Sequence, residues 1–356
     1  MAATPGTFTP SQNYADFRIA YESMFAEPGR IGKEFDTPIG TVAAITENAN
    51  YEIQDVLNDA FTNRTVKVNW LEDCSVTPVN AGDTAATCTI SGEEIGSDSQ
   101  EFDKNFDFYL ERTVKGDERN DLRSVEEKLA YTIELAKRNL ENKFNEQVLS
   151  TIESNFNSSN DYGDLAGGTY DSGTGVITYD PASWTADLIA EFDLMAQVNQ
   201  IVNPVFLHGT NLYKEVFLAN SKACCDNEGD RNLFGVFGHY WDTRQFITTY
   251  GTSTKPSYAI EPNSVVVWNA YQFENETPQH RMDSKNTHTW REPSTRLRDA
   301  QGNPFYFDIV WQRDCGIAGD GLYSVDHEVR VHLRGGIDIA PNNCSAGTGI
   351  LKFLNA

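Results

Sequence analysis

A stripe of apolar residues three or four positions apart predicts one long helix between Asp121 and Phe156. No glycine or proline interrupts this stretch, and the polar segment Asn157–Asn160 follows it. At about 1.5 Å per residue the helix would be on the order of 50 Å long, which favours an element that spans the whole subunit. A coiled coil is the alternative, but the spacing is not strictly heptad. The stripe consists of Leu122, Val125, Leu129, Ile133, Ala136, Leu140, Phe144, Val148, Ile152 and Phe156.

Alternation with a period of two predicts strands between Arg64 and Val114. It is clear at Val66, Val68 and Trp70, and looser from Phe102 to Leu110. The connection from Ser75 to Gln100 has few large apolar residues and is rich in glycine, serine and aspartate. A long hairpin with such a polar tip has little core of its own. It is either a flexible loop or an arm that gains its partners from another subunit.

The remaining elements are shorter. Helices are expected at Ala15–Phe25, Asn50–Phe61, Pro181–Val198 and Asn211–Lys222, with a Gly/Pro-broken loop at Pro28–Gly40 and a Gly-rich loop at Asp161–Thr178. Strands are expected at Asn203–Leu207, Arg244–Tyr250, Asn263–Asn269, Pro304–Gln312 and His327–Leu333. We find no internal repeat. Strands and helices in this mixture indicate an α+β fold.

The charge balance argues against direct nucleic-acid binding. The 356 residues include 52 acidic and 28 basic side chains, a formal net charge of -24. Such a chain repels phosphate groups. The plain interpretation of this charge is solubility. A sharper one is a protein that lies near concentrated nucleic acid without adhering to it. The hydrophobic fraction is only 39%, but 20 Phe and 15 Tyr still supply enough burial for a packed fold.

Motifs for catalysis and cofactor binding are missing from the sequence. We find no P-loop, no GxGxxG and no GxSxG, and the Gly167–Gly168 stretch has neither the lysine nor the strand–loop–helix context of a phosphate loop. The segment HEVRVH resembles a zinc-protease motif, but His327 and His332 are five residues apart, on a predicted strand. We therefore expect no catalytic residue, no cofactor and no metal site.

Two charged clusters have plain alternatives. The carboxylates Asp226, Glu228 and Asp230 could belong to a glycosidase, yet a solvated loop is the simpler interpretation. The arginines at positions 291, 296 and 298, beside Trp290, could contact phosphate or acidic groups of a neighbouring subunit, or lie in solvent.

The cysteines and the N-terminal sequence indicate in which cellular compartment the protein is made. Cys74, Cys88, Cys224, Cys225, Cys315 and Cys344 form neither a zinc-type spacing nor a dense disulfide framework, so reduced thiols are expected. Met1–Gln12 lacks the basic and apolar regions of a secretory signal, and no apolar run is long enough to span a membrane.

The order of these parts resembles the major capsid protein family of tailed bacteriophages. Within that family, NPVFLHGTNLYKEVFLANSK (Asn203–Lys222) is similar to a strand, small-residue turn and helix of the axial domain. RNLFGVFGHYWDTRQFITT resembles the loop and strand that follow it. Pro262–Trp268 looks like a further axial strand, and Val325–Ile339 like the strand that returns to the peripheral sheet.

The resemblance implies a division of the chain into the parts of that fold: N-terminal arm, extended β-hairpin loop, spine helix, peripheral domain and axial domain. The arm would be residues 1–63 and the extended loop 64–114. The peripheral domain would be 115–200, with the spine helix at 121–156. The axial domain would be 201–324, and residues 325–356 would return to the peripheral domain and form a tail.

The function implied is a structural one, without enzymatic activity. Pentamers and hexamers of the chain would form an icosahedral shell that encloses double-stranded DNA without reading its sequence, in a virion assembled in the host cytoplasm. The implied partners are a separate scaffolding protein, a portal and decoration proteins, with no membrane. The alternatives are an encapsulin-like compartment around protein cargo, a tail or decoration protein, and a carbohydrate-active enzyme.

Overall fold

The computed structural model describes residues 40–47, 65–71, 97–115, 125–156, 168–180, 188–199, 201, 203–208, 238–241, 256–281, 287–317, 323–340 and 348–355. The helices expected at Ala15–Phe25, Asn50–Phe61 and Asn211–Lys222, and the strand expected at Arg244–Tyr250, lie outside these residues.

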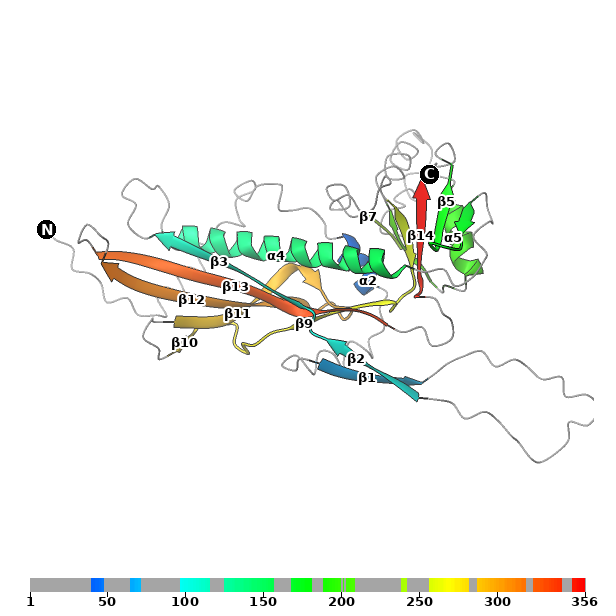
Figure 1. Ribbon diagram of the computed structural model, residues 1–356. Helices are drawn as coiled ribbons and strands as arrows, with labels where there is room; N and C mark the ends of the chain where they lie inside the picture. The colour runs from blue at the N-terminus through cyan, green and yellow to red at the C-terminus, as the bar shows by residue number, and fades with distance from the viewer. Residues whose placement is uncertain are drawn as a thin grey trace, which may run out of the picture.

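The long helix predicted from the apolar stripe is confirmed as α4, Val125–Asn155. It lies along one face of an antiparallel sheet (Figure 1). The stripe points at the sheet: Leu129, Ile133, Phe144, Val148 and Ile152 are each at most 1% exposed. The sheet runs in the order β10 (Gln279–Arg281), β11 (Thr287–Arg298), β12 (Pro304–Ile317), β13 (Tyr323–Ile339) and β3 (Phe106–Lys115), with β9 (Val265–Ala270) also paired to β13.

Period-two alternation explains how the sheet meets α4. Phe305, Phe307 and Ile309 on β12 are buried, and the residues between them face the other side of the sheet. On β13 the buried series is Val329, Val331 and Leu333, and register places Val331 opposite Ile309. The ring of Phe144 on α4 meets those of Phe106 and Phe305 edge-on, at centroid distances of 4.9 and 5.4 Å. These side chains form one continuous core.

A second sheet stands at the C-terminal end of α4 (Figure 1). Its strand order is β4 (Thr169–Asp171), β5 (Val176–Tyr179), β14 (Ile350–Asn355), β8 (Ser257–Ile260), β6 (Val205–His208) and β7 (His239–Trp241). Helix α5, Leu188–Val198, packs against it and forms a separate apolar cluster. Within that cluster Phe192 stacks on Phe353, with ring centroids 4.2 Å apart. Two pairings, β14–β5 and β6–β7, are parallel.

The expected β-hairpin is present, but its second strand is shorter than the sequence pattern indicated. Strand β1 (Thr65–Leu71) pairs antiparallel with β2 (Ser97–Asp103). The strand ends at Asp103. Lys104 and Asn105 belong to no strand, and the residues from Phe106 onward form β3 of the large sheet. The alternation from Phe102 to Leu110 therefore covers two strands with different partners, because β3 finds its partner in β13, more than 200 residues away.

Three further placements differ from the sequence expectation. The segment Gly40–Glu47 forms a helix, α2, whose Val42 and Ile45 are buried in the main core, although it falls within the stretch assigned to an arm. Strand β9, expected beside axial strands, pairs with β13. Strand β14, expected in a returning tail, lies between β5 and β8. The two strands are placed by pairing with segments distant in the sequence, and α2 is placed by packing against distant elements. A local pattern encodes neither kind of contact.

The predicted α+β class is confirmed by this arrangement of helices and antiparallel-rich sheets. Among the helices described, none combines the length and apolar character needed to cross a membrane.

Candidate interaction surface

The face of the large sheet turned away from α4 is polar. Because α4 takes the apolar side chains of one face, alternation leaves the charged ones on the other. Register pairs the residues of this face across β13 and β3: Arg334 lies opposite Asp107, His332 opposite Tyr109, and Arg330 opposite Glu111. We refer to this side of β3, β13 and β12 as the outer sheet face.

Opposite charges on the outer sheet face are paired within the chain. The Arg330 Nε lies 2.6 Å from an oxygen of Glu111, and an Arg334 Nη lies 3.2 Å from the buried Asp308. Asp308 also accepts hydrogen bonds from the backbone N–H groups of Gln272 and Phe273, at 2.9 to 3.0 Å. Burial raises the pKa of Asp308, against the lowering effect of these bonds and of Arg334. These contacts hold the face in one arrangement.

His332 has one preferred protonation state in this setting. Arg334 Nε donates to its Nδ1 at 3.2 Å, and its Nε2 is bonded to Asp107. Burial lowers the pKa of His332, and the hydrogen bond to Asp107 opposes that shift. The ring is therefore neutral near pH 7, with its proton on Nε2 and directed at the carboxylate.

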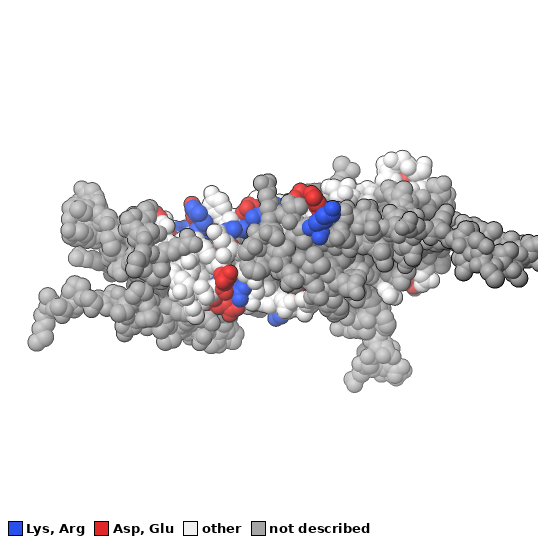
Figure 2. Space-filling model, turned by 90° about the horizontal axis from the view of Figure 1, so that it is seen from below, with Lys and Arg blue, Asp and Glu red and all other residues white. Residues whose placement is uncertain are grey.

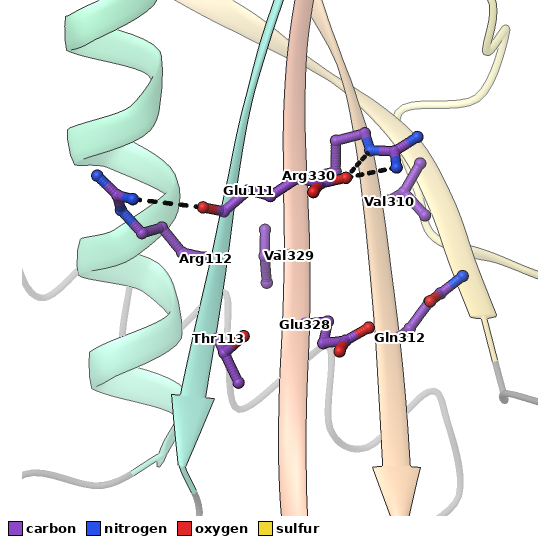
Figure 3. A pocket seen from close by; sticks show the side chains of 8 residues that line it. All are labelled: Glu111, Arg112, Thr113, Val310, Gln312, Glu328, Val329 and Arg330. Carbon is purple, nitrogen blue, oxygen red and sulfur yellow. Dashed lines mark hydrogen bonds and ion pairs between the residues drawn. The ribbon is translucent and has the colours of Figure 1, made fainter.

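A shallow pocket of about 450 Å³ opens on β3, β13 and β12 (Figure 3). In Figure 3 the Arg330 guanidinium points at the Glu111 carboxylate, while Glu328 and Gln312 lie further along the strands. No histidine or cysteine lines this pocket, so it offers no nucleophile–base pair of the usual kind. The lining suits hydrogen bonds and ion pairs with another polar surface. It consists of Glu111, Arg112, Thr113, Val310, Gln312, Glu328, Val329 and Arg330.

Two aromatic side chains are exposed on β3, which is the last strand of its sheet among the residues described. Phe108 is 40% exposed and Tyr109 is 54% exposed. The Tyr109 ring lies 5.0 Å from the Arg330 guanidinium and meets the His332 ring edge-on at 5.8 Å. Exposed aromatic groups beside arginine are common at the centres of protein–protein contacts.

Figure 2 shows the molecule from the side opposite α4. Over the described residues, acidic and basic side chains lie next to one another and do not gather into a region of one sign. On this described part of the face, a second copy would meet charges of both signs next to one another, although the chain as a whole has a net charge of -24.

The motif at His327 and His332 is on a strand, as predicted. His327 Nδ1 accepts a hydrogen bond from the Trp311 indole at 3.1 Å, on the side of the sheet that faces α4. His332 lies on the outer sheet face. The two histidines therefore do not converge, and the described residues contain no group of three or more potential metal ligands.

The three arginines near Trp290 do not form one site. Arg291 is stacked between Tyr271 and Tyr306, at 4.7 and 4.2 Å from the ring centroids. Arg296 pairs with Glu141 on α4 at 3.3 Å, and Arg298 donates to the carbonyl of Gly302 at 2.8 Å. The hypothesis of a shared phosphate-binding cluster is not supported, because each guanidinium has a separate partner within the chain.

The acidic cluster and most of the cysteines lie outside the described residues. Asp226, Glu228, Asp230 and the cysteines other than Cys315 lie outside the described residues, and Cys315 is described only as part of the β12 backbone. Sequence reasoning missed the Arg330–Glu111 pair, because its members are 219 positions apart. The alternation in β3 indicates that the strand has two different faces, but it does not indicate which face α4 covers.

No family model matches the chain, and no curated protein matches it. Solved phage structures are similar to it. One described as "Cyanophage Pam1 capsid asymmetric unit" is 12% identical with a TM-score of 0.46, over 83% of this chain and 86% of that chain. Another, "Mycobacterium phage Che8", is 14% identical with a TM-score of 0.44, over 87% and 90%. A third, "Asymmetric unit of bacteriophage PhiM1 mature capsid", is 11% identical with a TM-score of 0.40, over 83% and 82%.

These are likenesses to solved phage structures at 11–14% identity, and the resemblance expected from the order of elements stays a prediction.

Proposed function

We propose that this chain is a major capsid protein, a structural subunit that assembles with copies of itself into the icosahedral shell of a tailed phage. The observation that carries the proposal is the β1–β2 hairpin. It leaves the large sheet on the side opposite α4 and extends away from both apolar clusters (Figure 1). A projecting two-stranded hairpin is marginally stable alone, so it needs a surface to lie on, and other copies of the chain supply one.

The rest of the architecture supports an assembling subunit. The 31-residue helix α4 and the strands beside it form an elongated body. The outer sheet face and the edge of β3 offer this body a second contact region, polar at its rim and aromatic at Tyr109. Contacts of this asymmetric kind close into rings when repeated about a symmetry axis.

The parts of the subunit are assigned as follows. The extended loop is the β1–β2 hairpin with its connection, and the peripheral domain is α4 with the sheet from β10 to β3. The axial domain is the second sheet with α5. This assignment moves β4, β5, α5 and β14 to the axial side of the division expected from the sequence. It moves β9, β10, β11 and β12 to the peripheral side, where β13 was already expected.

The proposed partners follow from the same role. Copies of the chain form pentamers and hexamers, with a separate scaffolding protein, a portal and decoration proteins. The shell encloses double-stranded DNA without base-specific contacts, consistent with the acidic chain. The protein is located in the virion after assembly in the host cytoplasm and acts without enzymatic activity or cofactor.

Negative-stain electron microscopy of the expressed, size-fractionated protein tests the proposal, alone and with the neighbouring phage gene products. Closed shells, or rings of five and six, are the expected result. A monomer that persists with those partners contradicts it. Shells that contain a protein cargo and no nucleic acid assign the chain to an encapsulin-like compartment, and tubes or binding only to preformed shells assign it to a tail or decoration role.

A further inference from the structure

The ladder between β3 and β13 ends before β13 does. Its last pair is Phe106 with Gly335, whereas β13 continues to Ile339 and keeps β9 as the partner on its other edge. Continued in the same register, the ladder would place Lys104 opposite Ile337. The chain instead leaves the sheet at this point, and β2 extends away with β1 (Figure 1).

The Asn105 side chain lies against the edge of β13 where the ladder stops. Its amide donates to the carbonyl of Ile337 at 2.7 Å, and its oxygen accepts from the Ile337 N–H at 2.9 Å. In a continued antiparallel ladder, the same two groups of Ile337 would bond to the backbone of the residue opposite, Lys104. The Asn105 contact and a continued ladder therefore exclude each other.

The apolar pattern of this segment fits both arrangements. Phe102 and Phe106 are each 0% exposed and lie four positions apart, so the break between β2 and β3 does not change the face of a strand that they share. In a continued ladder Phe102 would lie opposite Ile339, which packs against the main core. The alternation from Phe102 to Leu110 is thus compatible with one continuous strand as well as with the two strands observed.

Two carboxylates favour the observed arrangement. In a continued ladder Asp103 and Asp338 would be directly opposite each other, where like charges are destabilising. In the observed arrangement Asp338 accepts hydrogen bonds from Trp268 Nε1 and from the Asn105 amide, both at 3.3 Å. The end of β2 nevertheless lies close to β13, because a Cβ added at Gly336 would be 2.8 Å from the carbonyl oxygen of Asp103.

We propose that the base of the β1–β2 hairpin is a joint with two positions. In the observed position, the Asn105 side chain covers the edge of β13 and the hairpin leaves the sheet. In the second position, Lys104 and Asp103 continue the ladder along β13, and the hairpin turns with them. Each position makes hydrogen bonds that the other lacks, so single side chains decide the populations. The joint rests on the proposed function for its use, because the direction of the hairpin sets which surface of a neighbouring copy it reaches.

The distance between the hairpin and the body of the full-length subunit tests the joint. Spin labels attached through a keto amino acid at positions 67 and 143, where Lys67 and Lys143 are exposed, leave the native cysteines unlabelled. Pulsed electron paramagnetic resonance should give one main distance in the unmodified subunit. Asn105→Ala should raise the population of a second, defined distance about 5- to 30-fold relative to the first, the effect of losing two hydrogen bonds. Adding Asp103→Asn should raise it further.

Glu101→Gln, made in the Asn105→Ala background, is the matched control for Asp103→Asn. It also removes one exposed carboxylate from β2, but a continued register places Glu101 opposite Ala340, which has no charge. The ratio of the two distances should therefore stay as it is in Asn105→Ala alone. A shift as large as that caused by Asp103→Asn overturns the register.

Two results for Asn105→Ala overturn the joint itself. An unchanged single distance shows that Asn105 does not hold the direction of the hairpin. A broad distribution without a second maximum shows that the released hairpin has no second position. The measurement uses the size-fractionated, unassembled subunit, with the urea midpoint as a check on folding. Failure of the joint is therefore distinguishable from failure of the chain to form shells.

Discussion

Lys352 on β14 forms an ion pair with Glu153 near the end of α4, and this contact joins the second sheet to the long helix. The other oxygen of Glu153 accepts a hydrogen bond from the Tyr258 hydroxyl on β8. The Lys352 ammonium also lies 4.6 Å from the centre of the Phe156 ring. The Glu153 carboxylate therefore forms an ion pair with one strand of the second sheet and accepts a hydrogen bond from the adjacent strand.

Replacing Lys352 by methionine should destabilise the protein by about 1–3 kcal/mol, because Glu153 would keep its charge in a partly buried place without its cationic partner. The side chain of Lys352 is only 7% exposed, and that of Glu153 is 22% exposed. Urea unfolding measures the loss. Lys143→Met is the control: its side chain is 46% exposed and should change the unfolding free energy by less than about 0.5 kcal/mol. Equal losses of unfolding free energy in Lys352→Met and Lys143→Met would contradict a stabilising contact between Lys352 and Glu153.

The arginines of β11 should differ in their effect on stability. Arg296 pairs with Glu141, which is 1% exposed and also accepts a hydrogen bond from Ser294 at 2.5 Å. Burial raises the pKa of Glu141, and Ser294 and Arg296 oppose the shift. Arg296→Met should therefore cost about 2–4 kcal/mol, because it leaves a buried carboxylate with less compensation.

Arg298→Met tests the same chemistry two residues along the strand. Its side chain is exposed and donates to the Gly302 carbonyl. Unfolding in urea should show a change below about 1 kcal/mol. A larger loss of stability for Arg298→Met than for Arg296→Met would contradict the prediction that the buried Arg296–Glu141 pair matters more for folding.

A pair of buried histidines should weaken the fold in acid. His208 Nε2 and His239 Nδ1 are 2.7 Å apart in the second sheet. Burial lowers the pKa of His239 to about 4, with Asp193 opposing, and burial and His239 lower that of His208 well below its usual value. Because the unfolded pKa is higher, the unfolded state binds the proton first. The stability contributed by His239 is present above pH 6.5 and is lost as the pH falls towards 4, a difference on the order of 3 kcal/mol.

Urea midpoints measured from pH 7.5 to 4.5 check this dependence. Carboxylates titrate in the same range, so the comparison is with His239→Gln, which keeps a hydrogen-bonding side chain and removes one titrating group. The variant should lose less stability on acidification than the unmodified protein. If the urea midpoints of the two proteins fall equally as the pH is lowered, His239 does not cause the loss of stability in acid.

The amount of structure that the sequence predicts depends on whether the signal is local. The apolar stripe of α4 is local, and its prediction was right to within a few residues. Helix α2 was missed, because eight residues carry little periodicity and Val42 and Ile45 are held by contacts with distant elements. The outer sheet face was missed for a related reason. Alternation indicates that a strand has two faces, but the register of β13 on β3 decides which residues meet.

Removing the hairpin tip, residues 79–97, should leave a folded subunit that cannot form stable shells. Both apolar clusters lie outside the deleted segment, so the circular dichroism spectrum and the urea midpoint should change little. The hairpin would lose the length with which it reaches another copy. Electron microscopy measures shell formation, and shells of normal number and stability from the deletion would contradict the role given to the hairpin.

A charge exchange on the outer sheet face separates its role within the subunit from its role between subunits. Arg330 and Glu111 are each about half exposed, so the pair contributes less than about 1 kcal/mol to folding. Arg330→Glu should abolish or strongly reduce shells while the subunit stays folded, because it places two carboxylates together on a contact surface. Adding Glu111→Arg restores the pair within the chain but reverses its polarity towards a neighbour. The double variant should therefore recover the unfolding midpoint and not the shells. Recovery of both would mean that the pair acts only within the subunit, and that copies of the chain meet through another face.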